Sequence, residues 1–287
     1  MSDNLRGALL MALAMAGFAL EDRFINLLAD AIPVGQILIL LGAGWALAFG
    51  ITAHRKGQAV LSPALLSRPI LIRNLAEMIG TIGFVLGFVL ASLATASAIL
   101  QAAPLFVTLG AIVFFGEKVG WRRWGAILAG FFGVMLIVRP GMAGFEPASI
   151  FAVIGVLGLA GRDLATRAVP RSVSSYQIST WAFFMMIPAG MLLMLAMGDR
   201  PVHPEPAQII KLAAALGIGV VAYYAIVAAM RVGELSFVTP FRYTRMLFAL
   251  VVAVLVFGER PDALTLTGAA IIIGAGLFTL WRERKLT

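Results

Sequence analysis

Charged side chains interrupt several otherwise apolar stretches of this 287-residue chain. Carboxylates and guanidinium groups in such surroundings can hold a solute of opposite charge, and the carboxylates can also carry protons. An ionised group at the centre of a hydrocarbon layer costs about 2.5–3.5 kcal/mol or more, so it normally faces a partner or a watery cavity. Four stretches contain such groups: Glu21-Asp22-Arg23; Arg73, Asn74 and Glu77; Arg162-Asp163, with Arg167 one turn later; and Arg242 with Arg245.

Other kinds of site chemistry lack the residues that they need. The chain has no cysteine, which excludes disulfides, thiol nucleophiles and thiolate metal ligands. Its two histidines, His54 and His203, fall in polar segments too far apart to suggest a metal site. The phosphate-binding pattern Gly-x-x-x-x-Gly-Lys-Ser/Thr is missing, so the chain does not hydrolyse ATP. The apolar stretches also lack the paired carboxylates or nucleophile–base pairs of a membrane-embedded enzyme, and we expect no metal, no cofactor and no enzymatic activity.

The composition places the chain in a lipid bilayer. Hydrophobic residues make up 61% of it, charged residues only 13%, and the mean hydropathy is +0.98. Soluble domains carry about 25% charged residues. A soluble fold of this length has too little interior to hide so much apolar surface. The net charge of +8 would suggest nucleic acid in a soluble protein, but here its cause is cationic loops beside the membrane.

Hydrophobic segments long enough to cross the membrane recur along the whole chain. A helix rises about 1.5 Å per residue, so roughly 20 apolar residues cross a hydrocarbon core of about 30 Å. The segment 78–116 has no charged residue and is long enough for two crossings with a tight turn near residues 92–95. We predict ten helices, at residues 5–28, 31–53, two within 78–116, 124–138, 148–168, 172–198, 212–230, 234–257 and 263–281.

The sequence repeats itself once, with a shift of 141 or 142 residues. Phe115-Gly116-Glu117-Lys118 returns as Phe257-Gly258-Glu259-Arg260, and Asp22 returns as Asp163. Two related halves built from membrane-spanning helices are the usual architecture of secondary transporters. We therefore expect an all-α integral membrane protein of ten transmembrane helices, formed by two inverted five-helix repeats at residues 1–143 and 144–287.

Lysine and arginine in the loops predict the orientation of the chain. With a cytoplasmic N-terminus, 4 of these residues lie outside and 13 inside. The outside set is Arg139, Arg200, Lys211 and Arg260, and the inside set is Arg6, Arg55, Lys56, Arg68, Lys118, Arg122, Arg123, Arg167, Arg171, Arg231, Arg282, Arg284 and Lys285. Both termini are thus predicted to be cytoplasmic. Because each half has an odd number of helices, the second half enters with the opposite polarity.

Two segments resemble the signatures of a known family. Residues 114–126 read Phe-Phe-Gly-Glu-Lys, three further residues, then Arg-Arg-Trp-Gly-Ala, and Val138-Arg139-Pro140-Gly141 follows them. This pattern resembles the first repeat of EamA-type proteins of the drug/metabolite transporter superfamily, and residues 256–261 resemble the second. The resemblance extends from Gly7 to Trp281. It implies the ten-helix, five-plus-five fold and transport by alternating access.

The resemblance also limits the transported molecule, here called the cargo. Members of the family move amino acids, vitamins, nucleotide conjugates and drugs. Bacterial amino-acid exporters, aromatic ones included, are similar to this chain in size and architecture, which implies export of small metabolites, foremost amino acids, across the bacterial inner membrane by a monomer. Import of a vitamin or nucleotide-like compound such as riboflavin is the alternative. A channel is an alternative of another class, but a channel does not need inverted halves and the sequence shows no repeated filter-like loop. Facilitated transport is favoured over proton coupling, since arginines near Glu77 and Asp163 can neutralise these carboxylates.

We expect the embedded charges and nearby polar or aromatic residues to line a central cavity. The predicted helices 5–28 and 148–168 are equivalent in the repeat, and matching polar breaks mark the binding sites of transporters. Arg242 and Arg245 are three residues apart, so one helix face would present both to a carboxylate. The repeat-equivalent Gln101 and Tyr243 would offer hydrogen bonds from opposite sides. The full set of candidates is Asp22, Glu77, Gln101, Arg162, Asp163, Tyr223, Tyr224, Phe241, Arg242, Tyr243 and Arg245.

A purely structural role is the alternative for several of these charges. Arg162-Asp163, or Glu21 with Arg23, can form internal pairs that hold helices together. Arg73 is expected to mark the cytoplasmic interface. Aromatic residues at helical spacing pack against one another more often than they bind a ligand.

Two further pairs of residues are assigned to the ends and bends of the helices. Glu117 and Glu259 are expected to stabilise loop ends rather than to bind a substrate. Pro104 and Pro240 fall in the fourth and ninth predicted helices, where proline removes a hydrogen bond of the helical ladder. We therefore predict hinges at these two prolines.

Overall fold

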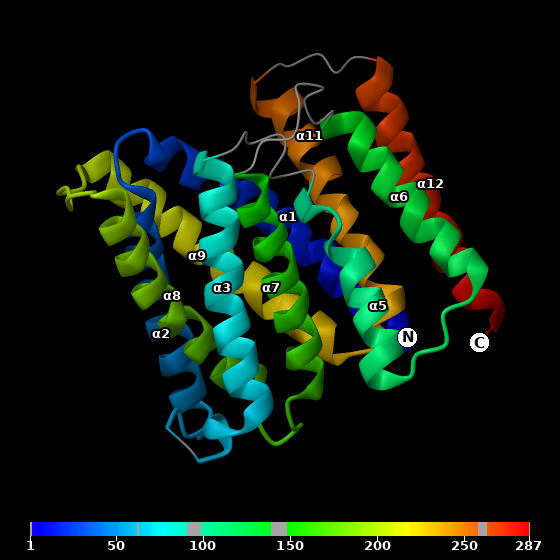
Figure 1. The fold of residues 1–287 in the computed structure, drawn as a ribbon, viewed down its shortest axis with the longest axis horizontal. Coiled ribbons are helices and arrows are strands. Elements are labelled where there is room, and N and C mark those ends of the chain that lie inside the picture. Colours follow the sequence, from blue (N-terminus) through cyan, green and yellow to red (C-terminus); the bar gives the residue numbers. More distant parts are fainter. Residues whose placement is uncertain (1, 62, 91–98, 139–147, 258–262, 287) are drawn as a thin grey trace.

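The computed structural model describes every residue except 1, 62, 91–98, 139–147, 258–262 and 287, and the described residues are built of helices joined by short loops (Figure 1). In chain order the elements are α1 (Asp3–Ala29), α2 (Val34–Arg55), η1 (Pro63–Leu66), α3 (Arg68–Leu90), α5 (Ala103–Phe115), α6 (Trp121–Val138), α7 (Ser149–Ala168), α8 (Ser175–Met197), α9 (Pro206–Arg231), α10 (Leu235–Val238), η2 (Thr239–Tyr243), α11 (Thr244–Phe257) and α12 (Ala263–Leu286).

The lengths and compositions of these helices suit a lipid bilayer. Within the described residues, five segments are long and apolar enough to cross it: Val34–Arg55, Arg68–Gly87, Ser175–Met197, Pro206–Arg231 and Leu235–Val252. α1 and α7 have 27 and 20 residues but carry embedded charges. Large apolar side chains also stay exposed along most helices, as a lipid-facing surface requires. The protein is an all-α integral membrane protein whose helices follow the order of the predicted spans.

The ends of the chain lie close together. Figure 1 shows both termini at the same end of the bundle as the loops 56–67 and 169–174, whereas the loop 198–205 lies at the opposite end. This arrangement is the one expected when an even number of crossings is divided into two halves with an odd number each. The predicted turn at residues 92–95 and the predicted boundary between residues 143 and 144 fall outside the described residues.

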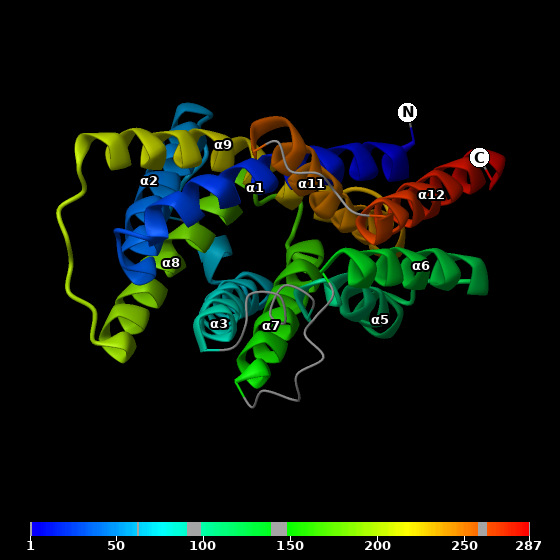
Figure 2. The same ribbon diagram turned by 90° about the horizontal axis from the view of Figure 1, so that it is seen from above.

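Helix packing follows the repeat. α3 packs along α7, and α1 packs along α9 (Figure 2). A Cβ atom added to Gly158 would lie 2.6 Å from the Cα atom of Gly80, and one added to Gly17 would lie 2.6 Å from the Cβ atom of Ala222. Gly17 is the repeat equivalent of Gly158, and Ala222 that of Gly80. The same close approach of helices thus occurs twice, as a twofold relation between the halves requires.

The ninth predicted helix, 234–257, is not continuous. It divides into α10, the 3₁₀ segment η2 and α11. Pro240 stands at the start of η2, where the missing N–H and the ring of proline no longer disturb an α-helical ladder. Pro104 likewise stands in the first turn of α5, after a turn at Gln101 and Ala102. Proline costs no hydrogen bond at a helix start, so Pro104 begins a helix rather than bending one, and Pro240 marks a break within the span.

The glycine contacts between α3 and α7 can be tested by one added methyl group. Gly158→Ala places that methyl against the backbone of Gly80, and such overpacking typically costs about 1–3 kcal/mol. Gly125→Ala is the matched control, because no atom lies within 4 Å of its added Cβ. We expect the melting temperature of the purified protein to fall for Gly158→Ala and not for Gly125→Ala. Equal melting temperatures would contradict the close approach of α3 and α7.

Candidate functional site

A cluster of buried charges begins on α3. Arg73 and Glu77 lie one turn apart on this helix, with the guanidinium 3.3 Å from the carboxylate. Arg73 is 1% exposed and Glu77 is 4% exposed. The expectation that Arg73 marks the cytoplasmic interface is therefore wrong, because its side chain extends into the protein interior.

Glu77 connects α3 to two other helices. Its Oε1 atom accepts a hydrogen bond of 2.9 Å from Arg162 of α7. Its Oε2 atom accepts a hydrogen bond from the hydroxyl of Tyr223 on α9. Both oxygens of this carboxylate are thus used, by residues 85 and 146 positions away in the sequence. Tyr223 was expected as an aromatic wall, and the structure adds a hydroxyl donor to that role.

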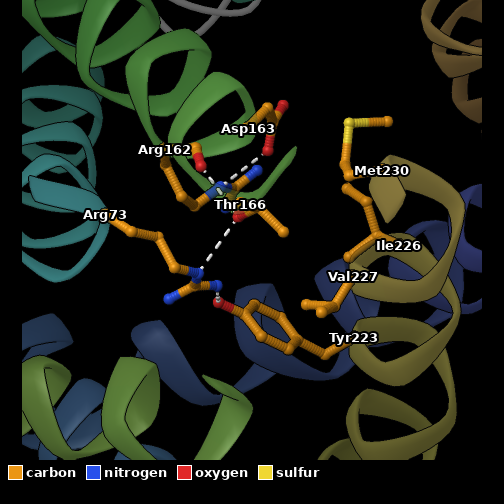
Figure 3. A pocket seen from close by; sticks show the side chains of 8 residues that line it. All are labelled: Arg73, Arg162, Asp163, Thr166, Tyr223, Ile226, Val227 and Met230. Atoms are coloured by element: carbon orange, nitrogen blue, oxygen red, sulfur yellow. Dashed lines mark hydrogen bonds and ion pairs between the residues drawn. The ribbon is translucent and has the colours of Figure 1, made fainter. Parts of the chain in front are cut away.

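Arg73 completes a narrow cavity between α3, α7 and α9. Its Nη2 atom donates to the hydroxyl of Tyr223 at 2.7 Å, and its Nε atom donates to the hydroxyl of Thr166 at 3.1 Å. Arg73, Arg162, Thr166 and Tyr223 all line this cavity (Figure 3). Sequence reasoning did not select Thr166, although it stands one helical turn after Arg162 and so shares its face.

Asp163 brings a fourth element into the cluster. Its Oδ1 atom accepts from Arg162 at 2.9 Å, and its Oδ2 atom lies 2.6 Å from Nη2 of Arg242 in η2. The second contact is an ion pair without hydrogen-bond geometry, since Asp163 Oδ2 and Arg242 Nε both lack a hydrogen-bond partner among the described residues. Three guanidinium groups, of Arg73, Arg162 and Arg242, therefore face two carboxylates, which leaves one positive charge in excess.

A second ion pair joins α1 to α11. Arg245 donates from Nε to Oδ2 of Asp22 at 3.0 Å and from Nη2 to Oδ1 at 2.6 Å. The guanidinium also stands 5.6 Å from the ring centre of Phe18. The side chains of Asp22 and Arg245 are 44% and 25% exposed, against 2% and 12% for those of Asp163 and Arg242. This pair therefore lies at a more open place than the cluster around Glu77.

The two arginines that were expected to share a helix face each pair with a different aspartate. Arg242 belongs to η2 and contacts Asp163 of α7, whereas Arg245 belongs to α11 and contacts Asp22 of α1. The helix type changes between the two residues, and their side chains reach opposite neighbours. Because the two aspartates are repeat equivalents, a single segment reaches the same position in both halves.

Two other candidates, Tyr243 and Tyr224, lie outside the charge cluster around Glu77. Tyr243 packs with Val134 and Ile272 in a separate hydrophobic cluster, and a Cβ atom on Gly130 would be 2.5 Å from its ring. The aromatic ring of Tyr224 stacks on that of Tyr176, with centres 4.8 Å apart. Both residues thus contribute to helix packing in this structure.

Phe241 and Gln101 are the remaining candidates. The ring centre of Phe241 lies 5.8 Å from that of Phe237, and Phe241 lines a second small cavity between η2 and α12. Gln101 is buried in the turn before α5. The expected hydrogen bonding of Gln101 and Tyr243 from opposite sides of one cavity stays a prediction.

Comparison with known proteins agrees with a membrane transporter. Residues 147–281 match the EamA-like transporter family. The chain is 26% identical over 221 residues to an S-adenosylmethionine uptake transporter of Rickettsia bellii, which covers 76% of this chain and 75% of the relative. These matches support an EamA-type transporter of the drug/metabolite transporter superfamily. Its fold is also that of a solved crystal structure, with a TM-score of 0.79 at 19% identity over 99% of the transporter and 98% of the other chain.

Two more relatives show the range of the family. A riboflavin transporter of Rhizobium johnstonii is 29% identical over 215 residues, covering 75% of this transporter and 70% of the relative. A pseudopaline exporter of Pseudomonas aeruginosa is 25% identical over 285 residues, covering 97% of each chain. Uptake and export both occur among the named activities of these relatives.

The charge cluster predicts a large effect of removing one carboxylate. Asp163→Asn leaves Arg162 and Arg242 without their common partner, and breaking a buried ion pair in this way typically lowers the free energy of unfolding by about 3–5 kcal/mol. Asp199→Asn, in an exposed loop, is the matched control and should have no effect. We expect denaturant titration of the purified protein to show this difference. The double variant Asp163→Asn/Arg242→Gln should recover part of the loss; a loss equal to the sum of the two single variants would contradict the pairing.

Proposed function

We propose that this transporter moves a small metabolite that carries a carboxylate, in particular an amino acid or a compound that contains one, by alternating access and without ATP. The observation that carries the proposal is the excess guanidinium of the cluster around Glu77. Arg242 supplies it most directly, because its buried Nε atom has no hydrogen-bond acceptor among the described residues. A carboxylate is the acceptor that a guanidinium binds best, often through two parallel hydrogen bonds.

An amino acid fits the ion pairs for a second reason. Its carboxylate can take the place of an aspartate beside an arginine, and its ammonium group can take the place of an arginine beside an aspartate. Such a zwitterion brings no net charge into the membrane interior, where unpaired charge is costly. The arginine–aspartate pairs, Arg242 with Asp163 and Arg245 with Asp22, would then close over the empty site.

The S-adenosylmethionine uptake transporter among the relatives supports a cargo of this kind, and the relatives include proteins of uptake and of export. S-adenosylmethionine carries the carboxylate and ammonium group of an amino acid, whereas riboflavin carries neither. We propose facilitated transport, as a monomer, across the inner membrane with both termini in the cytoplasm, through repeats at residues 1–143 and 144–287. Export of amino acids is then the direction when they accumulate inside. A riboflavin-like cargo is the second candidate, favoured by the riboflavin transporter among the relatives.

Transport by purified protein in liposomes distinguishes these cargoes. We expect saturable uptake of labelled S-adenosylmethionine, or of an amino acid such as methionine or phenylalanine, and no uptake of labelled riboflavin. An ionophore that dissipates a proton gradient should leave the rate unchanged, because facilitated transport needs no such gradient. Uptake of riboflavin alone would overturn the carboxylate proposal, and dependence on a proton gradient would overturn facilitated transport.

Arg245 tests the more open ion pair. We predict that Arg245→Ala lowers transport by about tenfold or more, because the cargo loses a cationic partner. The variant should still insert and fold, since the partly exposed Asp22 can be hydrated after the arginine is removed. Arg200→Ala, in an exposed loop, is the matched control. Equal transport by Arg245→Ala and wild type at equal membrane abundance would give Arg245 a structural role only.

A further inference from the structure

The Gly-Glu signature of the first half forms a turn that is directed at the second half. α5 ends at Phe115, and Gly116 follows with a φ angle of +66°. No atom lies within 4 Å of a Cβ added to Gly116, so glycine is required by the backbone conformation and not by lack of space. The N–H of Glu117 then donates to the carbonyl of Ala111 at 3.2 Å, which fixes the direction of the glutamate.

The carboxylate of Glu117 caps α10. Its Oε1 atom accepts from the backbone N–H of Leu235 at 2.8 Å, and its Oε2 atom accepts from that of Ser236 at 3.0 Å. The first N–H groups of a helix have no partner within the helix, and a carboxylate there also interacts favourably with the helix dipole. Leu235 and Ser236 are fully buried, so without Glu117 these N–H groups would have to find another acceptor in the protein interior.

Two more residues of the first half bind the start of α10. Arg123 of α6 donates to Glu234 at 2.6 Å and to the hydroxyl of Ser236 at 2.7 Å. The side-chain oxygen of Asn4 accepts from the backbone N–H of Glu234 at 2.8 Å. Glu117 and Arg123 both belong to the family signature at residues 114–126. The signature therefore holds the beginning of the segment that carries Arg242.

We propose that Glu117 is a positioning residue for transport. By capping α10, Glu117 fixes the start of the α10–η2 segment and so holds Arg242 against Asp163. The contact between Arg242 and Asp163 closes the transporter at the end where α10 lies. Only three residues of η2 separate Val238, the end of α10, from Arg242. A movement that separates Arg242 from Asp163 would have to strain or release the cap. The proposal rests on alternating access and not on the nature of the cargo.

A cysteine reporter measures the closure directly, because the chain has no cysteine of its own. Val238 is fully buried, and its side chain contacts the position that a Cβ on Gly7 of α1 would occupy. Val238→Cys in purified protein in nanodiscs should react slowly with a maleimide. Adding Glu117→Gln, which keeps one acceptor oxygen and places an NH₂ group where the other was, should raise this rate by about fivefold or more through local opening.

Two controls separate local release from general loosening. Glu205→Gln changes the exposed glutamate at the start of α9 and should leave labelling of Val238→Cys unchanged. Ala53→Cys, a fully buried reporter on α2, should stay slow in the Glu117→Gln background. If Glu117→Gln does not purify as a folded protein, Glu117→Asp is used with both reporters, and its shorter side chain should raise labelling at residue 238 by about twofold.

The proposal is overturned if labelling at residue 238 does not change in the folded variant. It is also overturned if reporters at residues 238 and 53 accelerate equally, since Glu117 would then support the fold in general. The labelling assay needs no cargo. A failure of the amino-acid proposal in liposomes therefore leaves this result intact, and the reverse also holds.

Discussion

A charge inside a bilayer must be paired, and in this protein the carboxylate of Glu77 connects the paired groups of three helices. It contacts Arg73 on its own helix, Arg162 on α7 and the hydroxyl of Tyr223 on α9. The 2.9 Å contact with Arg162 requires α3 and α7 to lie close together, and glycines at their interface permit this approach. Helix packing and charge pairing thus depend on each other, and Asp163 extends the network from Arg162 to Arg242.

The backbone of the two halves is more symmetric than their chemistry. Glu77 is equivalent to Gly219 in the repeat and Arg162 to Glu21, so the ion pair between α3 and α7 has no counterpart between α9 and α1. An aspartate stands at the equivalent position of each half, but both aspartates pair with arginines of the ninth predicted span. Under the proposed alternating access, a movement of this span would change both pairs together and so link the cargo to the conformation of the protein.

Much of this architecture could be predicted from the sequence. The apolar spans, the repeat and the embedded groups Glu77, Arg162 and Asp163 follow from composition and spacing, because the cost of burying charge is a property of the residues themselves. The choice of partners could not be predicted. The choice of partners depends on the rotation of each helix about its axis and on the distances between three helices. The sequence alone gives neither.

Arg73, and the pair of Arg242 and Arg245, show the same limit. Arg73 follows the start of α3 by little more than one turn, so its position along the chain suggested an interface, although its side chain extends inward and is 1% exposed. Arg242 and Arg245 would share a face in a regular helix. Sharing a face does not fix the partner of a long side chain, and only the structure shows that Arg242 reaches Asp163 and Arg245 reaches Asp22.

If the excess positive charge beside Arg242 receives a carboxylate of the cargo, the purified transporter should distinguish an amino acid that it carries from the matching carboxamide. The affinities for both ligands are measured in wild type and in Arg242→Gln. A site built around a hydrogen-bonded charge rejects the analogue strongly, so we expect about 100-fold weaker binding of the carboxamide by the wild type and little difference between the two ligands in the variant. If Arg242→Gln weakened the binding of both ligands equally and left the ratio of their affinities unchanged, the carboxylate of the cargo would not bind at Arg242.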